Sequence, residues 1–523
     1  MRLTLHRGVE LSVLHSARTE AEHHEELGCS IQGPGTRAVR RAMAPLKREI
    51  FRLGRERALE QAGALVGAME ASAAYAALCG PKRRAGRRLL RDEVLHPDPH
   101  RLAPRFLHFR NGALGLDVPV RGEGWPRAAD LVAALAAGVT RRELNALAGT
   151  GPLGDAVRDL LDAGWIHPAA PAPALASADA VFVGHNTVLL QTGGARILVD
   201  PYFRPASVFD LPSYQPMQAR DLGRIDAVVI THSHGDHLHL GSLLTLPRDT
   251  PILVPHVERE SLFSTDCALR LRQVGFTHAQ ALRWGETRTF GAATVRAWPF
   301  FGEQPTSGPG VHPGLFNEGA TWSVRGPERS AVFFADAGAD VRGDMRKVCD
   351  DLRQEGPIDL LFCGIRGFKL CPLFFAATTL EPFLVDVPKD ALTTPQQLMA
   401  DPFEALEYGA RLGARWVVPC ADGGAPWYWR EGMGPPYPGY PGTPVPGAGG
   451  HEENLDADPY PERLFEARRD RGSGPRPLLL RPGDGVRWRG AKAPEILLFD
   501  GFGWPFPESH PNRPRRQLPS RDG

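Results

Sequence analysis

The stretch Thr231–His237, with the sequence THSHGDH, decides how the rest of the chain is interpreted. It follows a short apolar run rich in β-branched residues, which predicts a buried strand. If the extended backbone continues, His232 and His234 point the same way, whereas Asp236 and His237 lie beyond a glycine, where the chain can turn back. Neutral imidazole and carboxylate groups suit zinc, iron or manganese. The strand end therefore predicts two groups of ligands, which could serve two divalent metal ions.

The order His-x-His-x-Asp-His resembles the signature of the metallo-β-lactamase superfamily. Segments 182–187 and 197–201 look like the opening strands of the branch that contains the N-acylphosphatidylethanolamine phospholipase D and ascorbate-phosphate lactonase enzymes. The resemblance covers roughly residues 180–421. It implies an α/β fold, a four-layer αβ/βα sandwich over residues 176–425. The alternation of apolar runs with helical stretches such as 401–412 agrees with that fold.

The resemblance also implies a role for each ligand. Asp236 and His237 would serve one metal, and His232 and His234 the other. A later apolar run ends in Asp336, which matches the aspartate that bridges both metals in the family.

Two further ligand positions depart from the family pattern. Where the family has its third histidine, this chain has Glu303, and the nearest histidine, His312, comes later. A carboxylate there favours iron or manganese over zinc. It resembles the ligand set of the diiron β-hydroxylase that acts on a carrier-bound amino acid in chloramphenicol biosynthesis. The last family histidine, expected after the strand 415–419, is also missing; Asp422 and Cys420 are the nearest donors, and the sequence leaves the choice between them open.

Other residues could line the substrate pocket. Arg366 follows another predicted strand and is a candidate catalytic residue, together with Asp236. His185 could reach the same pocket, or it could fix the end of its own strand. The aromatic stretch 427–429, next to Arg430, could wall the pocket, since clefts bury flat apolar surface. Core packing is the alternative for this stretch.

Length and composition limit the class of protein. The 523 residues favour two or three domains, and an apolar share of 42% indicates a globular chain. The balance of 61 basic and 60 acidic residues gives no sign of a nucleic-acid or membrane partner. Seven scattered cysteines without a Cys-x-x-Cys pair suit reduced thiols. With no secretory signal pattern and no long apolar run, we expect a cytoplasmic protein.

The amino-terminal region, residues 1–170, is expected to be mainly helical. Residues 37–91 contain 14 Lys or Arg and four Glu, which is compatible with a solvated basic surface or with docking of an acidic carrier protein or peptide. Residues 129–167 resemble a winged-helix module, with a capping box that begins at Thr140. Their arginines are outnumbered by acidic residues, so a packing or protein-contact role is favoured over DNA binding.

Proline-rich segments mark the expected domain boundaries. A proline-alanine linker at 168–174 precedes the metal domain, and a Pro/Gly-rich loop at 434–450 follows it. Residues 426–510 are expected to form a small appendage with strands at 477–480 and 495–498. We expect a disordered tail at 511–523.

Three functions are compatible with these observations. The first is hydrolysis of an ester, amide or phosphodiester of a small molecule by metal-activated water, and it has the broadest support in the family. The second is oxygen activation by a diiron hydroxylase that acts on a carrier- or peptide-bound substrate, which explains Glu303 and the missing histidines better. The third is a non-catalytic binding module. The intact motif argues against the third, because buried polar donors cost free energy when they are left unpaired.

Overall fold

The structure of the 523-residue chain is a computed structural model. It describes residues 1–14, 34–98, 103–112, 114–169, 178–203, 217–302, 304, 310–365, 367, 369–377, 380–421, 463–480, 482–488 and 494–498. Within these ranges, no helix is long and apolar enough to cross a membrane.

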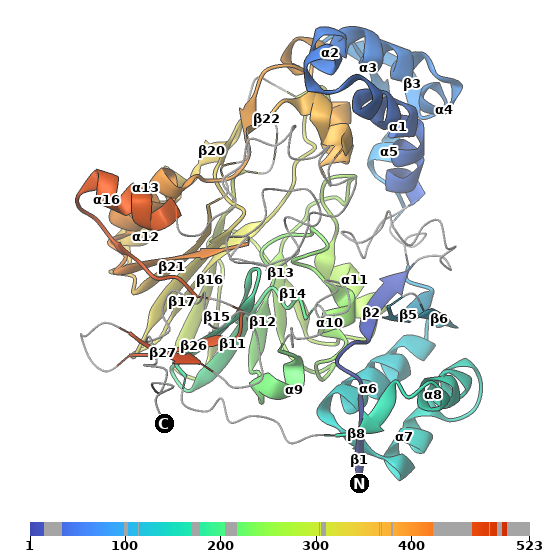
Figure 1. The fold of residues 1–523 in the computed structure, drawn as a ribbon, viewed down its shortest axis with the longest axis vertical. Helices are drawn as coiled ribbons and strands as arrows, with labels where there is room; N and C mark the ends of the chain where they lie inside the picture. The colour runs from blue at the N-terminus through green and yellow to red at the C-terminus, as the bar shows by residue number, and fades with distance from the viewer. Residues whose placement is uncertain are drawn as a thin grey trace, which may run out of the picture.

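Two mixed sheets form the centre of the molecule (Figure 1). The strands of the first sheet are β9 (Ala180–Gly184), β10 (Thr187–Thr192), β11 (Ala195–Val199), β12 (Ala227–Val229), β13 (Ile252–Pro255), β14 (Ala279–Leu282), β26 (Asp484–Arg487) and β27 (Glu495–Leu498). Their order is β14-β13-β12-β11-β10-β9-β26-β27. The pairs from β11 to β14 are parallel and the others antiparallel.

The second sheet has seven strands in the order in which they occur along the chain. They are β15 (Thr287–Phe290), β16 (Ala293–Pro299), β17 (Ala320–Arg325), β18 (Ser330–Ala335), β21 (Leu360–Gly364), β24 (Trp416–Cys420) and β25 (Arg476–Pro477). The carboxyl-terminal strands β25, β26 and β27 extend the two central sheets. The segment expected to be a separate appendage is therefore, in its described part, integral to the sandwich.

Three apolar layers separate the sheets and helices. The layer between the sheets contains side chains such as Phe182, Trp322 and Phe362. One outer layer lies between the first sheet and helices, and the other between the second sheet and helices. These outer helices are α9 (Ala219–Leu222), α10 (Leu240–Leu243), α11 (Cys267–Gln273), α12 (Met345–Gln354), α13 (Pro402–Leu412) and α16 (Arg463–Arg471). This is the four-layer αβ/βα sandwich that the sequence predicts.

Local sequence signals explain where α13 begins and ends. Asp401 and Glu404 form a reciprocal capping box at its start, with Pro402 in the first turn, where its missing N–H costs nothing. Gly413 takes the left-handed conformation just past the end. The helix expected at 401–412 is therefore confirmed.

A helical lobe lies at one end of the sandwich, in blue at the top of Figure 1. It packs against a 3₁₀ insertion that lies between β21 and α13 in the chain. The elements involved are α1 (Pro34–Leu53), α2 (Arg55–Glu60), α3 (Ala62–Ala71), α4 (Ala73–Ala76), β3 (Cys79–Arg84), β4 (Arg87–Leu90), α5 (Asp92–Leu95), η2 (Pro372–Ala377), η3 (Glu381–Asp386) and η4 (Lys389–Ala391).

A buried arginine fixes the lobe to this insertion. The Arg87 side chain is fully buried, pairs with Glu70, and donates to the carbonyls of Leu384 at 3.1 Å and Val387 at 2.6 Å. Removing one member of such a buried pair costs about 3–5 kcal/mol, because the other charge is left uncompensated. The lobe and the insertion therefore behave as one packed unit.

Asp386, at the end of η3, gives this contact a pH dependence. Burial raises the pKa of Asp386 to about 7, although the backbone N–H of His312 and the charges of Arg84 and Arg87 act in the other direction. The unfolded pKa is about 3.9. The stability that the neutral carboxyl contributes is therefore complete below about pH 4 and is lost as the pH rises to about 7.

The Asp386→Asn variant keeps a neutral acceptor for the His312 N–H and cannot ionise. We expect its free energy of unfolding to fall less than that of the wild type between about pH 5 and 8, by up to about 3 kcal/mol. Burial lowers the pKa of His312 to about 4, so that histidine stays neutral over this range. Urea unfolding across the range measures the difference, and parallel pH profiles would contradict the assignment.

A second amino-terminal module packs against α9 and α10, at the lower right of Figure 1. It consists of β1 (Arg2–Leu5), β2 (Glu10–Leu14), β5 (Phe106–Asn111), β6 (Leu114–Pro119), α6 (Gly124–Ala137), β7 (Val139–Thr140), α7 (Arg141–Ala148), α8 (Pro152–Asp162) and β8 (Ile166–Pro168). The capping box at Thr140 is confirmed. The strand order β7-β1-β8 beside three helices is compatible with the winged-helix resemblance. The described part of residues 1–170 thus contains strands as well as helices, in two separate places.

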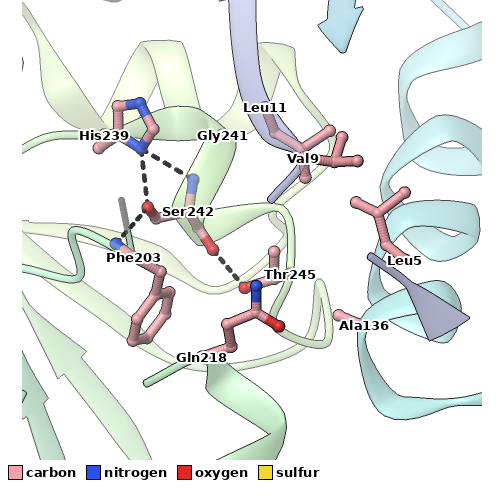
Figure 2. A pocket seen from close by; sticks show the side chains of 10 residues that line it. All are labelled: Leu5, Val9, Leu11, Ala136, Phe203, Gln218, His239, Gly241, Ser242 and Thr245. Atoms are coloured by element: carbon pink, nitrogen blue, oxygen red, sulfur yellow. Dashed lines mark hydrogen bonds between the residues drawn. The ribbon is translucent and has the colours of Figure 1, made fainter. Parts of the chain in front are cut away.

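The contact between this module and the sandwich is close. A Cβ atom on Gly241 would lie 2.0 Å from the carbonyl oxygen of Leu11, so only glycine fits there. Beside it lies a cavity of about 30 Å³, room for about one or two waters (Figure 2). In the wall of the cavity, His239 caps the start of α10. Its Nδ1 atom lies 2.7 Å from Ser242 Oγ, and this oxygen also accepts the N–H of Phe203 at 2.8 Å. These hydrogen bonds give His239 a structural role.

Candidate metal centre

The loop after β12 carries the histidine-rich motif. β12 is completely buried, and its continuation is held by a 2.9 Å hydrogen bond from the indole of Trp322 to the Ile230 carbonyl. The N–H of Ala320, at the start of β17, donates to the Thr231 carbonyl at 2.7 Å. Both sheets therefore fix the start of the motif. The buried strand expected directly before Thr231 is confirmed, with regular pairing over Ala227–Val229.

The structure brings four of the predicted ligands together. Asp336, which follows β18, has its Oδ2 atom 3.1 Å from His237 Nε2 and 3.8 Å from His232 Nε2. The ring centroids of His232 and His237 are 4.0 Å apart, and those of His232 and His234 are 4.6 Å apart. The first set of donor atoms that could hold a metal comes from His232, His237 and Asp336.

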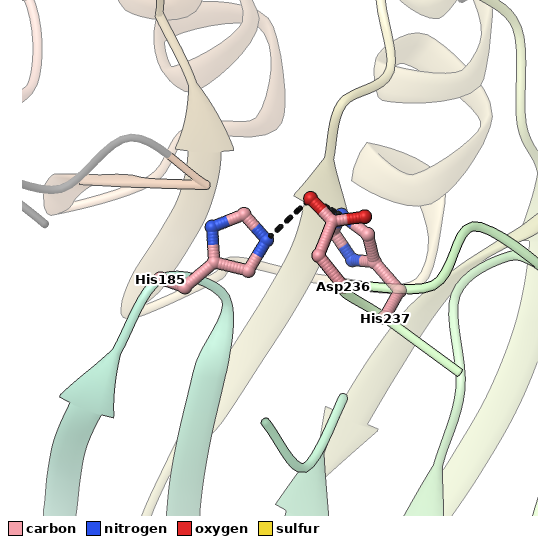
Figure 3. Close-up of side chains that lie close together, drawn as sticks. All are labelled: His185, Asp236 and His237. Atoms are coloured by element: carbon pink, nitrogen blue, oxygen red, sulfur yellow. Dashed lines mark ion pairs between the residues drawn. The ribbon is translucent and has the colours of Figure 1, made fainter. Parts of the chain in front are cut away.

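A second set of donors lies beside the first. His185, in the turn between β9 and β10, has its Nε2 atom 3.2 Å from Asp236 Oδ2 (Figure 3). His237 Nε2 lies 4.0 Å from the same oxygen. One donor atom each from His185, Asp236 and His237 lie within 4.8 Å of one another. His237 belongs to both sets, so the two candidate positions are adjacent.

Asp200 fixes the orientation of His237. Its carboxylate is fully buried at the end of β11 and lies 2.8 Å from His237 Nδ1. It also accepts the N–H of Thr231 at 2.7 Å and the hydroxyl of Thr231 at 2.6 Å. Because a carboxylate accepts the proton on Nδ1, the Nε2 lone pair of His237 is directed toward Asp336.

The arrangement fits a cation. In the neutral tautomer set by Asp200, the Nε2 lone pair of His237 faces a carboxylate oxygen, which is repulsive unless a positive charge lies between them. Asp336 Oδ1 is buried and has no hydrogen-bond partner among the described residues. Burying such an acceptor unpaired costs free energy that a bound metal ion would recover.

The ionisation of the cluster indicates the same need. Burial would raise the pKa of Asp236, but His237, His185 and His234 hold it well below its usual range. Burial disfavours the charged form of His237, yet Asp336, Asp236 and Asp200 raise its pKa well above the usual value. The cluster therefore favours positive charge at its centre.

The remaining predicted site residues divide into two groups. Glu303, Arg366, Asp422 and the stretch 427–430 lie outside the described residues. Cys420 is buried in the apolar layer between the sheets, alongside Val418. Its side chain is therefore placed in the core, which leaves Asp422 as the remaining sequence candidate at that position.

Two residues of the site were not assigned a ligand or positioning role from the sequence. Asp200 lies in the segment 197–201, which was identified only as a strand. Its contact with His237 joins residues 37 apart in sequence. His185 was given only an alternative between pocket and strand end. The local signals were the polar residues that directly follow the apolar strands β9 and β11.

The Asp200→Asn variant tests the orientation of His237. An amide in place of the carboxylate removes the charge that holds the Nδ1 proton, so we expect metal affinity to fall about 10- to 100-fold. Titration with Co²⁺, followed by visible absorption, measures this. Asp226→Asn, the same change just before β12, is the control and should leave the affinity unchanged. Equal affinities in both variants would contradict the role of Asp200.

The sequence of the metal domain matches a known protein family. Residues 195–419 match the profile described as a beta-lactamase superfamily domain. This region belongs to the metallo-β-lactamase superfamily. Its histidine motif, Asp336 and the sandwich agree with that membership, and the expected fold class is confirmed.

Relatives in this superfamily include different kinds of enzyme. A Streptomyces venezuelae protein named as the 3-hydroxylase of 4-amino-L-phenylalanyl on the CmlP peptidyl-carrier protein is 34% identical over 240 residues, 44% of this chain and 43% of that protein. The chain thus spans less than half of that relative in the alignment. An N-acyl-phosphatidylethanolamine-hydrolyzing phospholipase D from Caenorhabditis elegans is 25% identical over 202 residues, 36% of this chain and 54% of that enzyme.

A solved structure shares the fold over most of the chain. The crystal structure of CmlA, a diiron beta-hydroxylase from Streptomyces venezuelae, has a TM-score of 0.54 at 19% identity. The correspondence covers 95% of this chain and 100% of that one, so it extends well beyond residues 195–419.

Proposed function

We propose that this chain is a dinuclear metal-dependent oxygenase that hydroxylates a substrate carried on a protein. The observation that carries the proposal is that the sequence has Glu303, and not a histidine, at the position of the family's third histidine. His312, the nearest histidine after β16, directs its imidazole to the Val385 carbonyl in η3. A centre that relies on carboxylates at this position favours iron or manganese over zinc.

The backbone before Glu303 supports that residue as the missing donor. Phe300 stacks on His232, with ring centroids 5.2 Å apart. Gly302 is packed so closely that a Cβ atom would lie 2.7 Å from the N–H nitrogen of Gly338 and 3.2 Å from the Asp336 carbonyl oxygen. Glu303 therefore follows a segment that borders two of the proposed ligands.

The comparisons support the same class of reaction. Among the relatives named above, the carrier-dependent hydroxylase has the higher identity, and the diiron beta-hydroxylase corresponds in fold along nearly the whole chain. Both amino-terminal modules fall within a correspondence of that extent.

Each residue of the centre has a distinct task in this proposal. His232, His234, Asp236, His237, Glu303 and Asp336 would hold the two metal ions. A pair of iron ions supplies the redox chemistry that inserts one atom of O₂ into a C–H bond, while two electrons from an external reductant and two protons convert the other atom to water. Asp200 keeps His237 in the binding tautomer, and Phe300 limits the movement of the His232 ring.

The helical lobe supports a protein-bound substrate. The hairpin of β3 and β4 exposes Lys82, Arg83 and Arg84. One end of the lobe contacts a loop that lies beside the histidine motif. The Leu95 carbonyl accepts the N–H of Leu262 at 2.9 Å, and in the same loop the Thr265 N–H donates to Ser233 Oγ at 3.4 Å. An acidic carrier protein bound to the basic hairpin would therefore lie on a lobe that is joined to the motif through this one loop.

Hydrolysis is the second candidate. The observation that favours it is the shared superfamily region, which also relates the chain to an N-acyl-phosphatidylethanolamine-hydrolyzing enzyme. In that case the same ligands would activate a water molecule toward an ester, amide or phosphodiester.

Oxygen uptake separates the two candidates. Iron-loaded protein would be mixed with a reductant and with aminoacyl groups loaded on an acidic carrier protein, and the product examined by mass spectrometry. We expect oxygen consumption and a gain of one oxygen atom in at least one loaded substrate. Cleavage of ester or phosphodiester probes without any oxygen uptake would contradict the proposal and favour hydrolysis.

A further inference from the structure

The turn between β9 and β10 presents His185 to the centre. The residue is only 2% exposed, and its Nε2 atom lies 3.2 Å from Asp236 Oδ2 (Figure 3). Its ring lies 4.9 Å from that of His237 and edge-on to Tyr202 at 5.8 Å. The imidazole is therefore held in one orientation, toward an anionic oxygen and a second imidazole.

The backbone at His185 is in an unfavourable conformation. Its φ angle is +54°, in the left-handed region that costs a non-glycine residue roughly 1 kcal/mol or more. The neighbouring contact maintains it: the N–H of Ala421 donates to the His185 carbonyl at 2.9 Å. Ala421, with φ +64°, directly follows β24. Strain of this kind persists where surrounding contacts over-determine it, which is common at functional sites.

This contact places His185 where a ligand is missing. The resembled family has its last metal-binding histidine after the strand that corresponds to β24. In this chain no histidine occurs between His312 and His451. The hydrogen bond from Ala421 brings the His185 turn to that same strand end. A histidine from a different loop thus lies next to the place that the family histidine would occupy.

We propose that His185 binds the second metal ion through Nε2, together with Asp236, His237 and Asp336, and so replaces the last family histidine. The inference rests on the proposed dinuclear centre and adds a ligand to it. It also predicts a balanced pair, in which His232, His234 and a carboxylate hold one ion and His185, Asp236 and His237 hold the other, so that each ion has two imidazoles and one carboxylate besides Asp336. His185 comes from the first sheet's β9–β10 turn, so binding of the second ion would also stabilise the Ala421 contact between the two sheets.

The alternative is that His185 only hydrogen-bonds Asp236 and orients it. Two substitutions separate the roles, because asparagine and aspartate both tolerate the left-handed backbone. His185→Asn keeps an N–H donor for Asp236 and is a poor metal ligand. His185→Asp offers a carboxylate that can bind a metal and cannot donate. Circular dichroism and melting of both variants verify that the fold is retained.

Co²⁺ is the probe, with stoichiometry and affinity read from visible absorption and from metal analysis after gel filtration. We expect about two ions per wild-type chain, at least about 100-fold weaker binding of one ion in His185→Asn, and near wild-type stoichiometry in His185→Asp. Pulsed electron paramagnetic resonance of the cobalt protein should detect one fewer coordinated imidazole in His185→Asp, the variant that keeps both ions.

Three results would overturn the inference. Unchanged binding of both ions in His185→Asn would leave His185 as a positioning residue for Asp236. Loss of an ion in both folded variants would show dependence on the ring itself, not on a donor atom. A wild-type chain that binds a single ion would contradict the dinuclear centre of the proposed function, which distinguishes that failure from the other two.

Discussion

Asp336→Asn is expected to remove most of the bound metal from the protein. Asp336 lies 3.1 Å from His237 and 3.8 Å from His232, and its Oδ1 atom is buried without a hydrogen-bond partner in the described structure. An amide supplies no negative charge to either metal position. We expect affinity for both ions to fall by at least about 100-fold, since changes one step further from a metal already cost about 10- to 100-fold.

Metal analysis of the purified variant, with enzymatic turnover, measures this effect. The fold should persist, because β18 is buried by its own apolar side chains. Asp359→Asn, at the start of β21, is the matched control; Asp359 accepts the N–H of Ser330 at 3.0 Å at the opposite end of β18. His234→Ala should likewise lower metal content and abolish activity while the fold stays largely intact. Full metal occupancy in both Asp336→Asn and His234→Ala would show that the site is assigned wrongly.

Glu303→His is expected to change the reaction more than the fold. In a diiron centre, the glutamate supplies a hard anionic oxygen that stabilises the oxidised metal pair. Histidine removes one negative charge and favours zinc. We therefore expect oxygen-dependent turnover to fall steeply, with more zinc and less iron in the purified protein.

The same variant has the opposite expectation for a hydrolase. It restores the commoner family ligand, so hydrolysis of ester and phosphodiester substrates should survive or improve. An assay that pairs oxygen consumption with hydrolysis in wild type and variant decides between the reactions. If neither activity responds, Glu303 is not a ligand.

Local patterns in the sequence were sufficient for much of the sandwich. The apolar run before Thr231 and the run before Asp336 are strands β12 and β18, and both end at the centre. Each strand could be predicted from its short-range composition. The two strands lie in different sheets, and the packing of one sheet on the other brings His232, His237 and Asp336 together.

Long-range contacts limited the rest of the prediction. The bond between Asp200 and His237 and the pair of His185 with Asp236 join separate loops, and neither has a periodic signature. The helical lobe could not be assigned a position either, because its core is completed by η2 and η3, nearly 300 residues away from Arg87. β26 likewise pairs with β9 across the full length of the metal domain.

Metal analysis of protein purified without added metal, together with an ultraviolet-visible spectrum and a Mössbauer spectrum after growth on ⁵⁷Fe, tests the central claim most directly. The account predicts about two iron ions per chain and a coupled pair of iron sites, each with mixed nitrogen and oxygen ligands. Two zinc ions with no iron, in a protein that cleaves esters or phosphodiesters and consumes no oxygen, would contradict it.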